Sequence, residues 1–250
     1  MRLKIAYISL AFAGATSATP LPEYELQDAF IYDDGRVEQL VSMDGNTLTW
    51  STFAGRRYQR DRNFTIPLLQ WDTVESKGTR RASPEARSLW PLKPGKNVRF
   101  RVVTTASAQG KDGSIQRGRR TELWSCRVLP PAPITVPAGT FDSVEIRCEK
   151  FSPRTMRILS EERWYYSEEV GHYISRSWVE LSTGRRSGYA LVAALRGREA
   201  NPGRIRSILS GIKTTAGVHG CGALQIACVH GTSWAVQFDA RAGSRALIPV

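Results

Sequence analysis

The chain has little of what most enzyme active sites need. Its 250 residues include only three histidines and four cysteines. No Gly-x-Ser-x-Gly elbow of the kind that carries a nucleophilic serine occurs, and no glycine-rich loop leads into the Lys-Ser/Thr pair that holds phosphate. The sequence therefore leaves the catalytic residues unknown, and it predicts no cofactor and no metal.

Long apolar runs are also scarce. Arg2 and Lys4 precede an apolar segment at 5–15, and small residues follow as far as Ala18. This order predicts a cleavable secretory signal peptide over residues 1–18; the alternative is a first strand or helix of the fold. The segment is shorter than the roughly 20 apolar residues that span a bilayer. We expect a periplasmic or secreted protein with no transmembrane segment after signal removal.

Acidic residues are few relative to basic ones. Lysine and arginine number 35 against 23 aspartates and glutamates, for a formal net charge of +12. Such a charge can attract nucleic acid, another polyanion or an anionic membrane surface. The arginines are scattered in pairs and no nucleic-acid-binding motif surrounds them, so we expect no nucleic-acid partner. A solvated basic surface is the first interpretation, and an anionic lipid headgroup or acidic glycan as partner is the second.

Short alternating segments separated by turns fill most of the chain. Asp33-Asp34-Gly35 and Asp44-Gly45-Asn46 each stand between two such segments, which is the strongest short-range signal for a hairpin. The stretch 72–94 looks irregular, with Ser83 as a candidate cap for one or two helical turns. The pattern predicts a mainly β fold, an antiparallel up-and-down curved sheet or partly open barrel of about ten strands with little helix.

The alternation stops after Arg196. We therefore expect a β-rich domain over residues 19–196 and a C-terminal appendage over residues 197–250. Residues 197–203 have the composition of a linker.

The four cysteines fit an oxidising compartment, where an even number predicts disulfide bonds. Cys126 and Cys148 lie on the apolar faces of neighbouring predicted strands, so they are a plausible cross-strand pair; two buried free thiols are the alternative. Cys221 and Cys228 are the other candidates. Four cysteines allow three connectivities, and the sequence does not choose among them.

A second interpretation exists for the later cysteines. His219, Cys221, Cys228 and His230 are arranged symmetrically, and thiolate and imidazole are ligands that zinc accepts. A Cys221–Cys228 disulfide explains the same cysteines without a metal and is the favoured interpretation, and two free cysteines are the next alternative, ahead of the metal.

Two carboxylate pairs flank an aromatic run. Glu161-Glu162 and Glu168-Glu169 lie on either side of Trp164-Tyr165-Tyr166. Acids beside aromatic rings occur in glycan-cleaving sites, and they are also the ordinary charged edges of a hairpin. His172 starts a predicted strand beside a turn, where a surface residue is more common than a general base.

Three segments in order carry a resemblance: Leu89-Trp90-Pro91-Leu92-Lys93-Pro94-Gly95, Val136-Pro137-Ala138-Gly139-Thr140-Phe141 and Trp164 to Gly171. Together they resemble a group of exported bacterial β-rich proteins of the domain-of-unknown-function type, over roughly residues 30–195. These motifs are structural, because they set turns and core positions. The resemblance implies a β fold and no catalytic residues.

The expected function follows from export, β content and the aromatic residues. The first hypothesis is an envelope protein that binds a lipid, a glycan or a partner protein without catalysis. The alternative is a hydrolase of envelope glycan that uses a carboxylate pair, with Glu161 or Glu169 among the acids.

Overall fold

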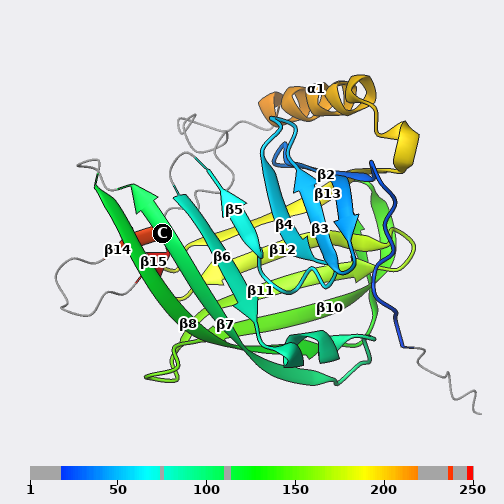
Figure 1. Ribbon diagram of the computed structural model, residues 1–250. Helices are drawn as coiled ribbons and strands as arrows, with labels where there is room; N and C mark the ends of the chain where they lie inside the picture. The colour runs from blue at the N-terminus through cyan, green and yellow to red at the C-terminus, as the bar shows by residue number, and fades with distance from the viewer. Residues whose placement is uncertain (1–17, 74–75, 110–113, 219–235, 239–246, 250) are drawn as a thin grey trace, which may run out of the picture.

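The computed structural model describes residues 18–73, 76–109, 114–218, 236–238 and 247–249. It is a β protein with one long helix on its outside (Figure 1). Residues 1–17, which hold nearly all of the predicted signal peptide, lie outside the described part.

Thirteen strands form one antiparallel sheet. They are β1 (Ala29–Tyr32), β2 (Val37–Asp44), β3 (Thr47–Ser51), β4 (Arg57–Asp61), β5 (Gln70–Asp72), β6 (Ser76–Ala82), β7 (Asn97–Gln109), β8 (Ile115–Val128), β9 (Ala132–Val136), β10 (Gly139–Phe151), β11 (Ile158–Ser167), β12 (His172–Glu180) and β13 (Arg186–Leu195). Two 3₁₀ helices, η1 (Pro84–Leu89) and η2 (Gly197–Glu199), one α helix, α1 (Pro202–Val218), and a separate pair, β14 (Val236–Phe238) and β15 (Leu247–Pro249), complete the described elements.

The sheet closes on itself. β13 pairs with β1, and β10 pairs with both β8 and β11, so twelve strands form a closed barrel. β9 is the extra strand, which forms a hairpin with the first residues of β10. The mainly β, antiparallel fold is confirmed. The barrel is closed rather than partly open, and the sheet has thirteen strands where about ten were predicted.

Both Asp-Gly hairpins are confirmed. β1 pairs with β2 around Asp33–Gly35, and β2 pairs with β3 around Asp44–Asn46. Gly35 has a φ of 81° and Gly45 a φ of 56°. These are left-handed conformations that glycine adopts at little cost, which is why the turn signal was reliable.

The stretch 72–94 has more regular secondary structure than its sequence predicts. It contains β6, whose residues Ser76, Gly78 and Arg80 alternate toward the inside of the barrel. The inward face of this strand is polar, so the apolar alternation that marks a half-buried strand is absent. The predicted helical turns are present as η1, which follows Ser83 and has Pro84 at its start.

Alternate hairpins of an up-and-down barrel turn at the same end. We call the end that carries the turns at 33–36, 52–56, 152–157 and 181–185 the rim end. We call the opposite end, with the turns at 44–46 and 168–171, the base end. The apolar core is concentrated at the base, where η1 and the residues after β4 fill the barrel. Its large buried side chains include Tyr24, Phe30, Trp50, Phe64, Leu89, Trp90, Ile146, Trp164 and Tyr166.

The helix α1 covers the outer face of β1 (Figure 1). Ile205 packs with Ala29, Ile31, Val37 and Leu195 in a small second core. The segment predicted to be a linker contains η2, and Ala200 beyond it is buried. No helix in the described ranges is long and apolar enough to cross a membrane.

Candidate functional site

The inside of the barrel changes character between base and rim. Above the aromatic core, charged side chains from several strands point inward and are buried. They form two clusters, one around Glu38 on β2 and one around Glu162 on β11. Neither cluster corresponds to a local sequence motif, because its members come from different strands.

Glu38 is the centre of the first cluster. Its Oε1 accepts a hydrogen bond from Arg60 Nη2 at 3.2 Å, and its Oε2 accepts one from the Tyr173 hydroxyl. His172 Nε2 lies 3.6 Å from the same Oε2. Burial alone would raise the pKa of Glu38, but Arg60 above all, with His172 and Arg36, holds that pKa well below its ordinary value. Glu38 is therefore a permanently ionised group inside the barrel.

His172 is buried, where the sequence predicted a surface residue. Its ring stacks on Phe30 with 3.9 Å between centroids, and its Nδ1 is 2.8 Å from the Tyr24 hydroxyl. Burial lowers the pKa of His172 to about 4, against the opposing effect of Glu38. The prediction failed because the ring is enclosed by aromatic side chains that lie far from it in the sequence, namely Tyr24, Phe30, Trp50 and Phe64.

Glu162 is the centre of the second cluster. Arg176 Nη2 donates to its Oε2 at 3.1 Å, and Lys150 forms an ion pair with its Oε1. Burial would raise the pKa of Glu162, but Lys150 and Arg176 lower it to about 2. The two cations also lie over aromatic rings, Lys150 over Trp124 at 4.6 Å and Arg176 over Trp164 at 4.2 Å.

Basic groups outnumber acidic groups in this layer. Three carboxylates point inward: Glu38, Glu122 and Glu162. Five cations on the same face of the sheet lie beside them: Arg60, Arg80, Arg120, Lys150 and Arg176. Burial lowers the pKa of Arg80. The carboxylates of Glu122 and Glu162 oppose this effect, whereas the positive charges of Arg176 and Arg120 add to it. Like charges are thus near enough to repel one another, which an additional anion would relieve.

Several donors in this layer lack an acceptor among the described residues. They include Arg60 Nε, Arg176 Nε and Trp164 Nε1, all buried. Each of these groups can only donate a hydrogen bond. Leaving such a group unsatisfied costs about 1–3 kcal/mol, so we expect acceptor atoms beside these donors, supplied by buried water or by a bound ligand.

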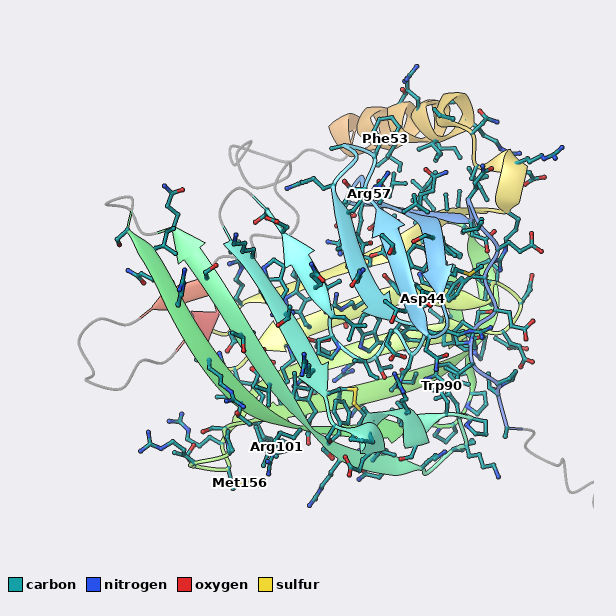
Figure 2. All side chains as sticks on the ribbon, viewed as in Figure 1. Asp44, Phe53, Arg57, Trp90, Arg101 and Met156 are labelled. Atoms are coloured by element: carbon teal, nitrogen blue, oxygen red, sulfur yellow. A yellow bond between two sulfur atoms is a disulfide. The ribbon has the colours of Figure 1, made fainter. Side chains whose placement is uncertain are left out.

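A cavity of about 290 Å³ reaches this layer from the rim. Arg36, Glu38, Tyr58, Arg60 and Trp71 form its inner wall. The β3–β4 turn forms its outer wall, with Phe53 and Arg57 at the mouth (Figure 2). Four lining residues are arginines and three are acids, so cations outnumber anions by one along the cavity: Arg36, Arg56, Arg57 and Arg60 against Asp34, Glu38 and Asp72.

The cysteine predictions divide between described and undescribed residues. Cys126 on β8 is the register partner of Cys148 on β10, and a disulfide joins them. Both are fully buried, so this bond links two strands within the core. Cys221, Cys228 and the two histidines beside them lie outside the described residues.

The predicted carboxylate pairs are not brought together as an acid–base pair. Glu161 and Glu162 are consecutive on β11, so they point to opposite faces of the sheet. Glu161 accepts a hydrogen bond from Arg163 at 2.6 Å on the outer face. Glu168 and Glu169 are exposed in the turn at the base. The ionised and fully paired Glu162 has no proton to donate near neutral pH.

No protein-family model and no curated protein matches the chain. Among solved structures, it is similar to the hypothetical lipoprotein YmcC from Escherichia coli, with 11% identity and a TM-score of 0.42 over 66% of this chain and 82% of that one. A presumed exported protein with a YmcC-like fold from Bacteroides fragilis gives 12% identity and a TM-score of 0.34 over 72% and 100%. A presumed lipoprotein from Parabacteroides distasonis gives 10% and 0.32 over 71% and 99%.

Proposed function

We propose that the chain is an exported binding protein that holds a small anionic group inside its barrel and performs no chemistry on it. Buried Arg60 carries this proposal. It contributes to the cavity wall, neutralises Glu38, and still has an Nε–H without an acceptor among the described residues. The surrounding excess of cations makes an anion the ligand that best completes the hydrogen bonding and the charge balance.

The size of the cavity restricts the ligand. About 290 Å³ is at the lower limit of the range for small-molecule sites. It fits a carboxylate or phosphate group with a short attached portion, such as a lipid headgroup or one acidic sugar, rather than a whole acyl chain. Tyr58, Trp71 and Phe53 provide flat apolar surface beside the arginines, which suits an amphipathic anion.

The titratable groups around the cavity support binding rather than catalysis. Glu38 is ionised and engaged with Arg60 and Tyr173. His172 is neutral near pH 7, and its Nδ1 is engaged with Tyr24. A general acid or base needs a pKa near the working pH, and neither group has one.

Isothermal titration calorimetry with inorganic phosphate, glycerol 3-phosphate and glucuronate at low salt tests the proposal. We expect at least one of these anions to bind and to raise the melting temperature. Arg57→Gln removes one cation from the mouth and should weaken binding about tenfold. Arg101→Gln, on the exposed outer face of β7, is the matched control and should leave binding unchanged.

Arg60→Gln should weaken binding more strongly, provided that thermal unfolding shows a folded protein. If none of the three anions binds, or if Arg57→Gln and Arg101→Gln have equal effects, the cavity is not an anion site and the proposal is rejected.

A further inference from the structure

Three hairpin tips at the rim end share one composition. They are the β3–β4 tip (52–57), the β10–β11 tip (152–158) and the β12–β13 tip (181–186). The second and third are neighbours, because Leu181 N donates a hydrogen bond to the Leu159 carbonyl at 2.9 Å. The first borders the cavity mouth. We call these three tips together the rim surface.

Each tip exposes a large apolar side chain. Phe53 is 47% exposed, Met156 59% and Leu181 50%. A single exposed apolar residue is ordinary on a protein surface. Here the large exposed apolar side chains of the described residues are unevenly distributed, since Ile115 and Ile158 also lie at this end and only Leu26, Val41 and Met43 lie elsewhere.

Each tip also carries two exposed arginines and no acidic residue. The pairs are Arg56 and Arg57, Arg154 and Arg157, and Arg185 and Arg186. The turns at the base end differ, because they expose Asp44 in one and Glu168 and Glu169 in another. The remaining rim turn at 33–36 exposes Asp33 and Asp34 and is not part of the rim surface, so the combined basic and apolar character belongs to the three tips alone.

We propose that the rim surface docks on an anionic lipid bilayer. Arginine guanidinium groups can contact lipid phosphates, while the apolar side chains between them enter the boundary between headgroups and acyl chains. The presence of both residue types on each tip is what selects this partner. A soluble polyanion would use the arginines and leave Phe53, Met156 and Leu181 exposed to water.

The docking surface goes beyond the proposed function and does not depend on the cavity being occupied. Its position nevertheless connects the two, because Phe53 and Arg57 belong both to the rim surface and to the cavity mouth (Figure 2). A barrel docked through its rim end would present the cavity to the lipid headgroups.

Co-sedimentation with vesicles tests the docking surface. The full chain is mixed with phosphatidylcholine vesicles that contain phosphatidylglycerol, and separately with vesicles of phosphatidylcholine alone. We expect binding to the anionic vesicles, with a partition coefficient that falls as salt increases. We expect little binding to the neutral vesicles.

Variants that avoid the cavity keep this test separate from the test of ligand binding. Arg154→Gln/Arg157→Gln/Arg185→Gln should lower the partition coefficient by at least about tenfold. Met156→Ser/Leu181→Ser should lower it several-fold. The matched controls are Arg99→Gln/Arg101→Gln/Arg127→Gln on the barrel wall and Leu26→Ser/Met43→Ser away from the rim, all at exposed positions. Melting temperatures show which variants are folded.

Two results would overturn the proposal. The first is equal binding of the rim variants and their matched controls. The second is that the protein binds the soluble polyanion heparin as tightly as it binds anionic vesicles, and that Met156→Ser/Leu181→Ser changes neither affinity. That result would mean that the arginines bind a soluble polyanion. The result that supports the proposal is different: the rim variants lose vesicle binding while their anion binding in calorimetry is unchanged. That outcome would also show that the rim surface and the cavity act separately.

Discussion

The indole ring of Trp71 on β5 lies across Gly78 on β6. A Cβ atom at position 78 would come within 2.4 Å of Trp71 Cζ2 and within 2.7 Å of the Thr105 carbonyl oxygen. The second contact is with backbone, which has little freedom to move aside. Trp71 also donates its Nε1–H to Ser76 Oγ at 3.2 Å. The missing side chain at Gly78 thus allows the ring to form a wall of the cavity.

Gly78→Ala should destabilise the protein by about 1–3 kcal/mol, the usual cost of adding a methyl group to a closely packed site. Urea denaturation measures the change in the free energy of unfolding. In a Trp71→Leu background the same substitution should cost less, because one of the two clashes is removed. An identical cost in both backgrounds would show that the ring is not the obstacle.

The stability of the protein should depend on pH through His172. The folded protein keeps its imidazole neutral down to a pKa of about 4, whereas the ordinary value is 6.5. Between these values the unfolded chain binds a proton that the folded protein does not, so the free energy of unfolding falls as pH decreases from about 6.5 to about 4. The total loss is about 3 kcal/mol. Denaturation at several pH values measures it.

His172→Gln should flatten that part of the pH profile. The charged groups around the ring, Glu38, Arg60 and Arg196, remain in the variant. Glu38 and Glu162 also have lowered pKa values, and their effect on stability begins about one pH unit above the ordinary value of 4.5, so the range from about pH 6.5 to about pH 5.5 isolates the histidine. An unchanged slope in the variant would contradict a buried neutral His172.

Arg60→Met should destabilise the protein by about 3–5 kcal/mol, because Glu38 would remain buried without its main counter-ion. The double variant Glu38→Leu/Arg60→Met should cost less than Arg60→Met alone, since no uncompensated charge is left. The matched control is Arg204→Met. Arg204 forms an ion pair with Glu199 at 3.6 Å that is exposed on both sides, so we expect a loss below about 1 kcal/mol.

Replacing both bridged cysteines, Cys126→Ala/Cys148→Ala, should lower the free energy of unfolding by about 3 kcal/mol. The bond joins residues 22 positions apart, and a loop of that size restricts the unfolded chain by about this amount. Thermal and urea denaturation of the oxidised protein and the variant measure the difference. Equal stability of the two proteins would show that the bridge contributes nothing.

Local patterns predicted the parts of this fold that depend on neighbouring residues. The hairpins at Gly35 and Gly45 follow from short-range turn chemistry. The placement of Cys126 and Cys148 on facing strands follows from the alternation of each strand. Closure of the barrel could not be predicted in this way, because it depends on the pairing of β1 with β13, whose residues are far apart in sequence.

The candidate site was missed for a physical reason as well. Sequence patterns identify interiors by their apolar residues, and the layer near the rim has an interior of arginines and glutamates. Arg80 on β6 and Arg60 on β4 resemble surface residues in the sequence, and only the barrel shows that they face Glu162 and Glu38.

The pairing of β1 with β13 also constrains when the barrel can form. Ala29 meets Leu195, so the ring cannot close until nearly the whole barrel sequence is available to fold. Contacts this distant in sequence are slow to form, because the entropy of closing a long loop must be overcome first. For the export that we propose, the chain would have to remain unfolded until it has crossed the membrane. This topology delays completion of the barrel until its last strand has emerged.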